Sequence, residues 1–310
     1  EIQMLFIKNG RIFTMAGEVI ENGSILIDDS KIIEVGEDLV APLDAETIDV
    51  EGKMVLPGFI DAHCHIGMWE EGMGFEGDDG NEMIEPVTPQ LRAIDAINPM
   101  DMSFEEAYAG GVTTAVTGPG SANVIGGMFV ALKTYGKRVD DMILKDPVAM
   151  KIAFGENPKR VYESQKKSPM TRMATAAILR ETLFKAKAYK EKKEQGKEDP
   201  SKMPEYDMKM EALLKVLNKE IPLKAHAHRA DDIFTALRIA KEFDLDITLD
   251  HCTEGHLIAD YLAREGKGVI VGPTLSNRSK VELRNLTFDT PRILHEAGVK
   301  IAIMTDSPVI

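Results

Sequence analysis

From Met54 onward the chain alternates short apolar runs with longer amphipathic stretches, and this alternation most constrains its fold. Continuous apolar runs are typical of parallel strands covered on both faces, and the amphipathic stretches between them predict helices. Eight runs are expected to be strands: residues 55–62, 112–117, 129–132, 148–152, 222–225, 247–250, 268–271 and 299–304. We therefore predict the α/β class, with a (β/α)₈ TIM barrel over residues 55–310.

The first 54 residues have a different pattern, in which short β-type runs are separated by turn residues. Asn9-Gly10 between residues 5–7 and 11–14 predicts one hairpin, and Asp28-Asp29-Ser30 predicts a second. We expect residues 1–54 to form a small β-sandwich module ahead of the barrel.

Two further features of the barrel region are a helical insertion and an early C-terminal end. Residues 160–221 read as a helical insertion, with helices expected at 173–195 and 205–219. The chain stops four residues after Asp306, where the last predicted strand ends. Because a (β/α)₈ barrel normally continues into an eighth helix, we expect the sequence to be truncated at its C-terminus.

The composition limits the partners and the compartment. The net charge of −14, from 37 Lys and Arg against 51 Asp and Glu, argues against a nucleic-acid partner. No run reaches the roughly 18 apolar residues that a membrane helix needs, so no membrane contact is expected. Cys64 and Cys252 cannot form a disulfide framework, which favours a reducing cytoplasm. A small-molecule substrate is the expected partner, and a homo-oligomer stays open.

His63-Cys64-His65 ends the first predicted barrel strand. On an extended strand, residues two apart point to the same face, so both imidazoles can reach one ion while Cys64 faces away. Imidazole suits zinc and other first-row transition metals. The carboxyl ends of barrel strands carry the active sites of such folds, so this position favours a metal ligand pair.

Three other polar residues follow apolar strands abruptly: His226, His251 and Asp306. Each alone could be an independent hydrogen-bonded residue at a strand end. All of them, together with His63 and His65, fall at the same predicted rim of the barrel, which favours one shared site.

These residues resemble the amidohydrolase superfamily, and its prolidase-like and imidazolonepropionase-like members in particular. The resemblance covers nearly the whole chain. It depends on the β-rich N-terminus, Leu56-Pro-Gly-Phe-Ile-Asp-Ala-His-Cys-His65, Gly111-Val-Thr-Thr114, His226, His251 and Thr305-Asp306.

The resemblance implies that His63, His65 and Asp306 bind one divalent metal, and that His226 and His251 bind a second ion in binuclear members. Zinc is the ion expected first, with Fe, Mn, Co or Ni as alternatives. Such members also use a bridging ligand after the fourth strand. Lys151, carboxylated, and Glu156 are both candidates, and Lys151 is slightly favoured over Glu156. The alternative for Lys151 is that it points outward between helices.

The implied activity is metal-dependent hydrolysis of a C–N bond in an amide, peptide-like or cyclic amide substrate. A metal-activated water would attack, and Asp306 would transfer its proton to the leaving nitrogen. The enzyme class is a hydrolase of non-peptide C–N bonds or a dipeptidase. A deaminase on the same scaffold is one alternative, and a catalytically silent structural homologue is another.

Three weaker candidates surround this site. His228 lies two residues after His226, so it shares that face if the strand continues, and we assign it a catalytic or substrate-contacting role. Arg229 and Arg278 lie in predicted loops after strands five and seven, where a cation could hold a substrate carboxylate.

Overall fold

The chain divides into two compact units, Glu1–Phe59 and Ile60–Ile310. The computed structural model describes residues 4–70 and 73–309. Each unit has a sheet of its own.

The first unit contains a five-stranded sheet with the order β3-β2-β1-β4, in which β5 also pairs with β1. Strands β1 to β3 are antiparallel neighbours, while β4 and β5 run parallel to β1. The strands are β1 Leu5–Ile12, β2 Ile20–Asp28, β3 Lys31–Gly36, β4 Glu46–Asp49 and β5 Met54–Val55. They form one sheet, and the second layer of a sandwich stays a prediction.

The hairpin predicted at Asn9-Gly10 is wrong. These residues lie inside the single strand β1, where the pairing with β2 shifts register between Ile7 and Gly10. Asn9 adopts a left-handed φ of 57°, which produces a bulge instead of a turn. The second predicted hairpin is confirmed, because β2 and β3 are joined through Asp29, at φ 56°.

The second unit contains an eight-stranded sheet with the order β13-β12-β11-β10-β9-β8-β7-β6, which confirms the eight predicted barrel strands. They are β6 Phe59–Cys64, β7 Val112–Thr117, β8 Ile125–Lys133, β9 Ile143–Ala153, β10 Leu223–Ala227, β11 Ile247–His251, β12 Val269–Val271 and β13 Ile301–Ile303. The segment after β13 returns to β6, since Asp306 N donates to His63 O at 3.1 Å and His65 N donates to Ser307 O at 2.7 Å. The barrel is therefore nearly closed.

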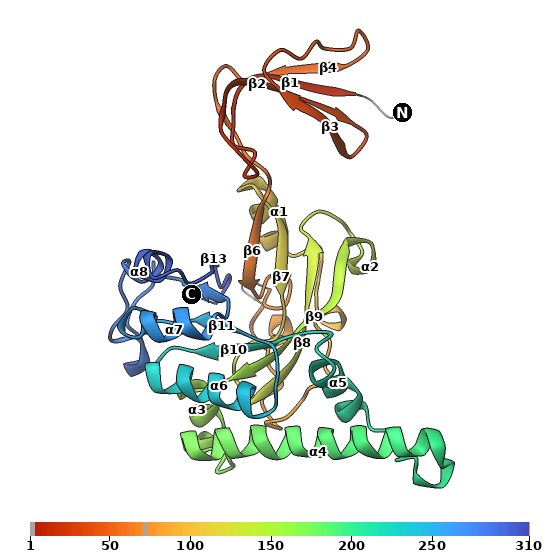
Figure 1. Cartoon of the computed structure of the whole chain (residues 1–310), viewed down its shortest axis with the longest axis vertical. Coiled ribbons are helices and arrows are strands. Elements are labelled where there is room, and N and C mark those ends of the chain that lie inside the picture. Colours follow the sequence, from red (N-terminus) through yellow and green to blue (C-terminus); the bar gives the residue numbers. More distant parts are fainter. Residues whose placement is uncertain (1–3, 71–72, 310) are drawn as a thin grey trace. The chain divides into compact units, whose positions relative to one another are not determined.

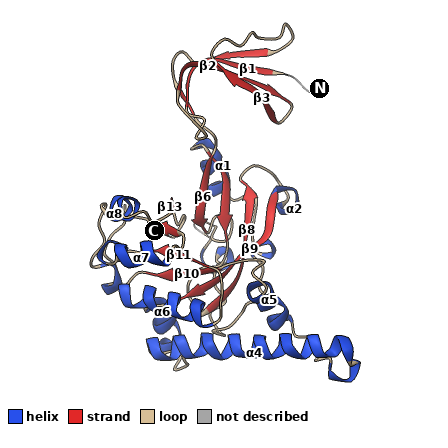
Figure 2. Cartoon of the chain, in the orientation of Figure 1, coloured by secondary structure: helices blue, strands red, loops and turns tan. Residues whose placement is uncertain are grey.

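One part of the barrel prediction needs correction, because β8 runs antiparallel to both β7 and β9. Only residues 118–124 separate β7 from β8, and residues 134–142 separate β8 from β9. Parallel strands need a crossover of about a dozen residues or more, so these short connections enforce a meander. Along the chain β7, β8 and β9 follow one another with only the short helix α2 between them (Figure 1), whereas β10 and β11 are each followed by a helix (Figure 2).

The helices lie mainly in the second half of this unit. They are α1 Met102–Ala109, α2 Val139–Met142, α3 Glu156–Ser164, α4 Arg172–Glu198, α5 Met208–Leu217, α6 Ala230–Glu242, α7 Ala259–Glu265 and α8 Thr290–Glu296. Short 3₁₀ helices occur at Gly74–Gly77, Ala93–Asp95, Pro200–Lys202, Gly255–Leu257 and Val281–Leu283. Within the described part of the chain, none of the helices has the length and apolar character needed to cross a membrane.

The two helices of the predicted insertion are confirmed as α4 and α5. The Thr171 hydroxyl accepts a hydrogen bond from Ala174 N at 3.0 Å and caps the start of α4. Leu179 and Leu183 are fully buried in the core shared with β9 and β10. Figure 1 shows α4 as one long helix, with α3, α5 and α6 packed against it.

Candidate metal centre

Six polar side chains meet where strands of the second unit end. Strand β6 ends beside His63 and His65, β10 beside His226 and His228, β11 at His251, and the segment after β13 carries Asp306. All of them except His65 belong to two groups, each of which could hold a metal ion, and His65 contacts Asp306 of one group. The structure therefore brings together the histidines and the aspartate that the sequence placed at one rim.

The first group consists of His63, His251 and Asp306, whose ligand atoms all lie within 4.8 Å of one another. Oδ1 of Asp306 is 3.1 Å from Nε2 of His63 and 3.2 Å from Nε2 of His65. Both imidazoles of the His63-Cys64-His65 segment thus reach the same carboxylate oxygen. Cys64 is buried, with its Sγ 3.7 Å from the Val116 carbonyl oxygen.

Asp61 connects β6 to the segment that carries Asp306. Its Oδ1 accepts hydrogen bonds from the backbone nitrogens of His63, at 3.3 Å, and Thr305, at 3.2 Å. Because Thr305 directly precedes Asp306, this buried carboxylate holds the two ligand-bearing segments in register.

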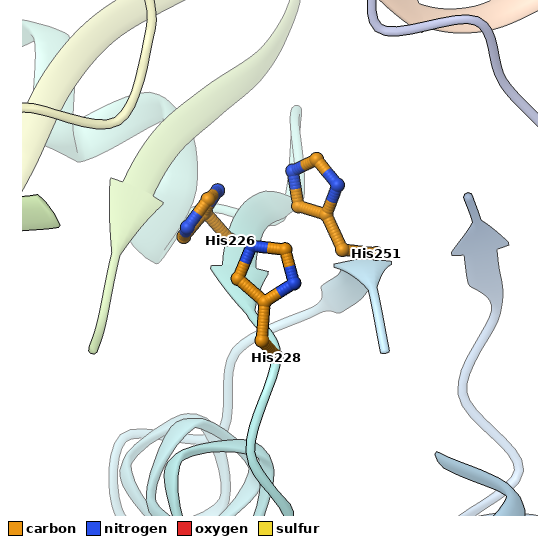
Figure 3. Close-up of side chains that lie close together, drawn as sticks. All are labelled: His226, His228 and His251. Carbon is orange, nitrogen blue, oxygen red and sulfur yellow. The ribbon is translucent and has the colours of Figure 1, made fainter. Parts of the chain in front are cut away.

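The second group consists of His226, His228 and His251, whose ligand atoms also lie within 4.8 Å of one another. Figure 3 shows the three rings gathered around a common space, with His226 and His228 on one segment and His251 at the end of a neighbouring strand. His251 belongs to both groups, so the two groups adjoin.

The backbone is strained at two of these residues. His251 has φ 71° and Asp306 has φ 61°, both in the left-handed region that non-glycine residues seldom adopt. Asp250 and His251 are neighbours on β11, and a regular strand would point them to opposite faces. The left-handed turn at His251 lets both side chains enter the barrel interior. Such strain typically occurs at functional sites and costs about 1–3 kcal/mol per residue.

Backbone carbonyls determine which imidazole nitrogen is free. Nδ1 of His65 lies 2.7 Å from the Gly118 carbonyl oxygen, and Nδ1 of His251 lies 2.8 Å from the Gly272 carbonyl oxygen. A carbonyl can only accept, so Nδ1 carries the proton in both rings and Nε2 presents its lone pair to the centre. This is the usual arrangement of histidines that bind metals.

Several buried atoms of the centre find no hydrogen-bond partner among the described residues. They are both ring nitrogens of His63, Nε2 of His226 and Oδ1 of Asp306. An unsatisfied buried polar atom costs about 1–3 kcal/mol, so this concentration calls for a cation. Imidazole nitrogens and a carboxylate oxygen fit zinc and other first-row divalent ions. The donor set therefore fits a metal.

The charge states also suit metal binding. Burial lowers the pKa of His63, His226 and His228 well below the usual value, which keeps these imidazoles neutral. Burial alone would raise the pKa of Asp306, but the nearby His251 and His65 hold it below its usual value. Neutral imidazoles and an ionised carboxylate are the forms that coordinate metals.

Lys151 lies on β9 inside the barrel, fully buried, so the alternative that points it outward is wrong. Its Nζ is 3.5 Å from Oδ2 of Asp250. Oδ1 of the same carboxylate accepts a 2.7 Å bond from Lys224 Nζ, and Oδ2 is 3.3 Å from Nδ1 of His63. Burial lowers the pKa of Lys151 to about 8.

The structure does not bring Glu156 into either group. It begins α3, where its Oε2 accepts from the Glu282 backbone nitrogen at 3.3 Å and its own backbone nitrogen donates to Glu282 Oε2 at 2.9 Å. This reciprocal pair orients Glu156 toward the loop that carries Glu282.

A cavity of about 350 Å³ opens onto the centre and is lined by His65, His226, His228, His251 and Asp306, among others. Neither Arg229 nor Arg278 is among its lining residues. The Arg229 guanidinium pairs with Asp231 at 2.6 Å, and that of Arg278 donates to the Leu286 carbonyl at 2.8 Å. The placement of the two arginines does not support the substrate-binding role predicted for them.

Four charged residues near the centre were missed from the sequence: Lys224, Asp250, Arg160 and Lys280. Lys224 precedes His226 by two residues, so strand alternation could have found it. Asp250 is adjacent to His251, so its inward direction could not be predicted without the left-handed backbone at His251. Arg160 and Lys280 line the cavity from α3 and from the loop after β12, and no sequence signal identifies them.

No family model matches the chain. The crystal structure of an amidohydrolase from Thermotoga maritima MSB8 is 45% identical in sequence, with a TM-score of 0.95 over 99% of this chain and 79% of that chain. The chain belongs to the amidohydrolases.

Two curated relatives of this amidohydrolase match over different lengths. Amidohydrolase tasK from Hapsidospora irregularis is 29% identical over 315 residues, which cover 93% of this chain and 32% of tasK. The chain thus spans about a third of the length of tasK. A 5′-deoxyadenosine deaminase from Methanococcoides burtonii is 44% identical over 66 residues, which cover 21% of this chain and 15% of that protein.

Proposed function

We propose that this amidohydrolase is a metal-dependent hydrolase that cleaves a C–N bond of a small amide, peptide-like or cyclic amide substrate. The observation that carries the proposal is the convergence of neutral, buried imidazoles with an ionised aspartate. Among the described residues, the ring nitrogens of His63, Nε2 of His226 and Oδ1 of Asp306 form no hydrogen bond of normal geometry. This donor set opens onto a cavity large enough for a small substrate.

In this proposal His63, His65 and Asp306 would hold one divalent ion, and His226 and His251 would hold a second. Zinc is the first expectation, with Fe, Mn, Co or Ni as alternatives. When bound, such an ion supplies Lewis acidity, which lowers the pKa of water to about 7 and polarises a substrate carbonyl.

The protein residues would divide the remaining tasks. Asp306 accepts a proton from the attacking water and returns it to the leaving nitrogen, because its pKa is held low enough to keep it ionised. His228 lines the cavity, with its Nδ1 2.7 Å from Thr253 Oγ1, and so presents its other edge to the substrate.

Lys151 is proposed as the bridging ligand in carboxylated form. Its nitrogen would attack CO₂, form an N–C bond and release one proton, which requires the neutral amine. A pKa of about 8 makes that form much more accessible at neutral pH than in an ordinary lysine. Lys224 would compensate the new negative charge beside Asp250. Lys151 shares the Asp250 carboxylate with His63, whereas the Glu156 carboxylate accepts from the Glu282 backbone, which favours Lys151.

The alternatives are less well supported. The similarity to a deaminase covers only 21% of this chain, so it does not favour deamination over hydrolysis. A silent homologue would be expected to have lost ligands, whereas the histidines and Asp306 are all present. Three points stay predictions: the choice between a dipeptide and a non-peptide amide as substrate, the cytoplasmic location, and the homo-oligomeric state.

The test compares His63→Ala with His295→Ala, which removes an exposed histidine on α8 that belongs to neither ligand group and does not line the cavity. Elemental analysis of purified protein should find one or two divalent ions per chain, and His63→Ala should lose metal together with turnover of dipeptides, N-acyl amino acids or cyclic amides. His295→Ala should retain both. Metal content and turnover unchanged in His63→Ala would refute the proposal.

A further inference from the structure

The cavity beside the metal centre contains two cations that the proposed metal chemistry does not use. Arg160 lines it from α3, and Lys280 lines it from the loop after β12. Both face the same space as His228 and Asp306, which also line it.

Arg160 has no carboxylate within ion-pairing distance among residues 4–70 and 73–309. Its one polar contact there is a 3.5 Å bond from Nη2 to the Asn157 side-chain oxygen. The chain has 51 acidic residues against 37 Lys and Arg, so partners for an arginine are abundant. A guanidinium that lines a cavity without such a partner is available to a ligand.

Lys280 is held near the centre by a buried carboxylate. Its Nζ lies 3.9 Å from Oε1 of Glu282, whose side chain is fully buried. Oε1 of Glu282 is also 3.9 Å from Nε2 of His228. Lys280 is thus partly compensated by Glu282 and lies close to the metal centre, while no carboxylate of the described residues pairs with Arg160.

Arg160 and Lys280 line the same cavity and their charges interact. Burial is the main cause that lowers the pKa of Lys280, the charge of Glu282 opposes it, and the charge of Arg160 lowers it further. Arg160 and Lys280 therefore lie near one another.

Neutral donors complete this side of the cavity. The side chains of Ser121 and Asn157 line it and are joined by a 2.7 Å hydrogen bond, and Ser279 lines it next to Lys280. Of the described residues that line the cavity, Asp306 at the metal centre contributes the sole carboxylate. Away from the metal ligands, the wall therefore favours an anion.

We propose that Arg160, assisted by Lys280, binds a carboxylate of the substrate, so that the substrate class is an amide that carries a free acid, such as an N-acyl amino acid or a dipeptide. The position of the scissile amide rests on the proposed function, whereas the carboxylate site rests on the cations alone. A guanidinium can bind a carboxylate through two parallel hydrogen bonds, which also fixes the orientation of the substrate.

The single tryptophan of the chain provides a direct binding assay. Trp69 lines the same cavity, with its ring 5.0 Å from that of His65. Zinc-loaded protein is titrated with N-acetylglycine and N-acetyl-L-leucine, and with the corresponding C-terminal amides, while Trp69 fluorescence is recorded. We expect each acid to bind about 10- to 100-fold more tightly than its amide, the usual range for a hydrogen bond to a charged group.

The decisive variant is Arg160→Met, and Lys159→Met is its matched control. Lys159 is the preceding residue on α3 and does not line the cavity, so both variants remove one positive charge from the same helix. In Arg160→Met the affinities for each acid and its amide should differ by no more than about 3-fold. Lys159→Met should retain the preference for the acid. Arg160→Lys, which keeps the charge without the two parallel donors, should lie between them and shows that the fold tolerates substitution here.

The outcomes separate this inference from the proposed hydrolysis. Equal affinities for acid and amide, no binding of either acid, or a preference that survives in Arg160→Met would overturn the carboxylate site. Turnover of uncharged amides together with such a result would leave the hydrolase proposal intact. Carboxylate-selective binding without metal-dependent turnover of any amide would overturn the hydrolase proposal alone.

Discussion

Replacing Asp250 with Asn should destabilise the second unit strongly. The Asp250 carboxylate is fully buried and lies 2.7 Å from Lys224 Nζ and 3.5 Å from Lys151 Nζ. Asparagine keeps the shape but removes the charge, which leaves two buried ammonium groups without a carboxylate partner. Breaking a buried ion pair by removing one member costs about 3–5 kcal/mol, and we expect a loss of stability in this range.

The assay is urea unfolding of metal-free protein followed through Trp69, which lies in the second unit and reports its unfolding. Asp260→Asn is the control, because Asp260 forms an exposed ion pair with Arg264 on α7. Exposed pairs of this kind contribute about 0–1 kcal/mol, so the control should unfold nearly like the unaltered protein.

A double variant separates the charge effect from a general disturbance. Adding Lys224→Met to Asp250→Asn removes one of the two uncompensated charges, and this should restore part of the lost stability. The reasoning is refuted if Asp250→Asn loses no more stability than Asp260→Asn, or if the double variant is no more stable than Asp250→Asn.

Two further predictions concern titration and reactivity. The pKa of Lys151 is about 8 in the folded protein against 10.5 ordinarily, so between these values the unfolded chain binds more protons and stability should rise with pH. The free energy of unfolding of metal-free protein, measured by urea titration, should increase from pH 7.5 to 10 by on the order of 3 kcal/mol. A rise of the same size in Lys151→Met would contradict this cause. Burial raises the pKa of the Cys64 and Cys252 thiols, so iodoacetamide at pH 8 should leave both unmodified in folded protein and should alkylate both in urea. Mass spectrometry measures the modification. Rapid alkylation of the folded protein would contradict this prediction, because it would show that the thiols are accessible.

Local patterns in the sequence predicted most of the barrel. All eight strands of the second unit were found as apolar runs, and both helices of the insertion were found from their amphipathic pattern. The direction of β8 was missed, although the seven residues that separate it from β7 are too few for a crossover. The bulge at Asn9 was read as a turn because the same residue types favour both.

Local patterns also predicted part of the candidate site. Strand alternation placed His63 and His65 on one face, and His226 and His228 on another, and the structure has both pairs at the centre. Alternation cannot predict that His251 points inward beside Asp250, since a left-handed backbone at His251 breaks the pattern. The two arginines chosen from predicted loops lie outside the cavity, whereas Arg160 reaches it from a helix.

The sequence by itself determined the chemical types of the ligands and the strand ends where they lie, because these follow from residue identity and from a period of two along each strand. Only the tertiary structure decided which side chains form ion pairs and which line the same cavity. Lys151, Lys224 and Asp250 lie on three strands, and their pairing depends on the parallel register of β9, β10 and β11. Electrostatic interactions depend on distance through space, which the order of residues along the chain does not specify.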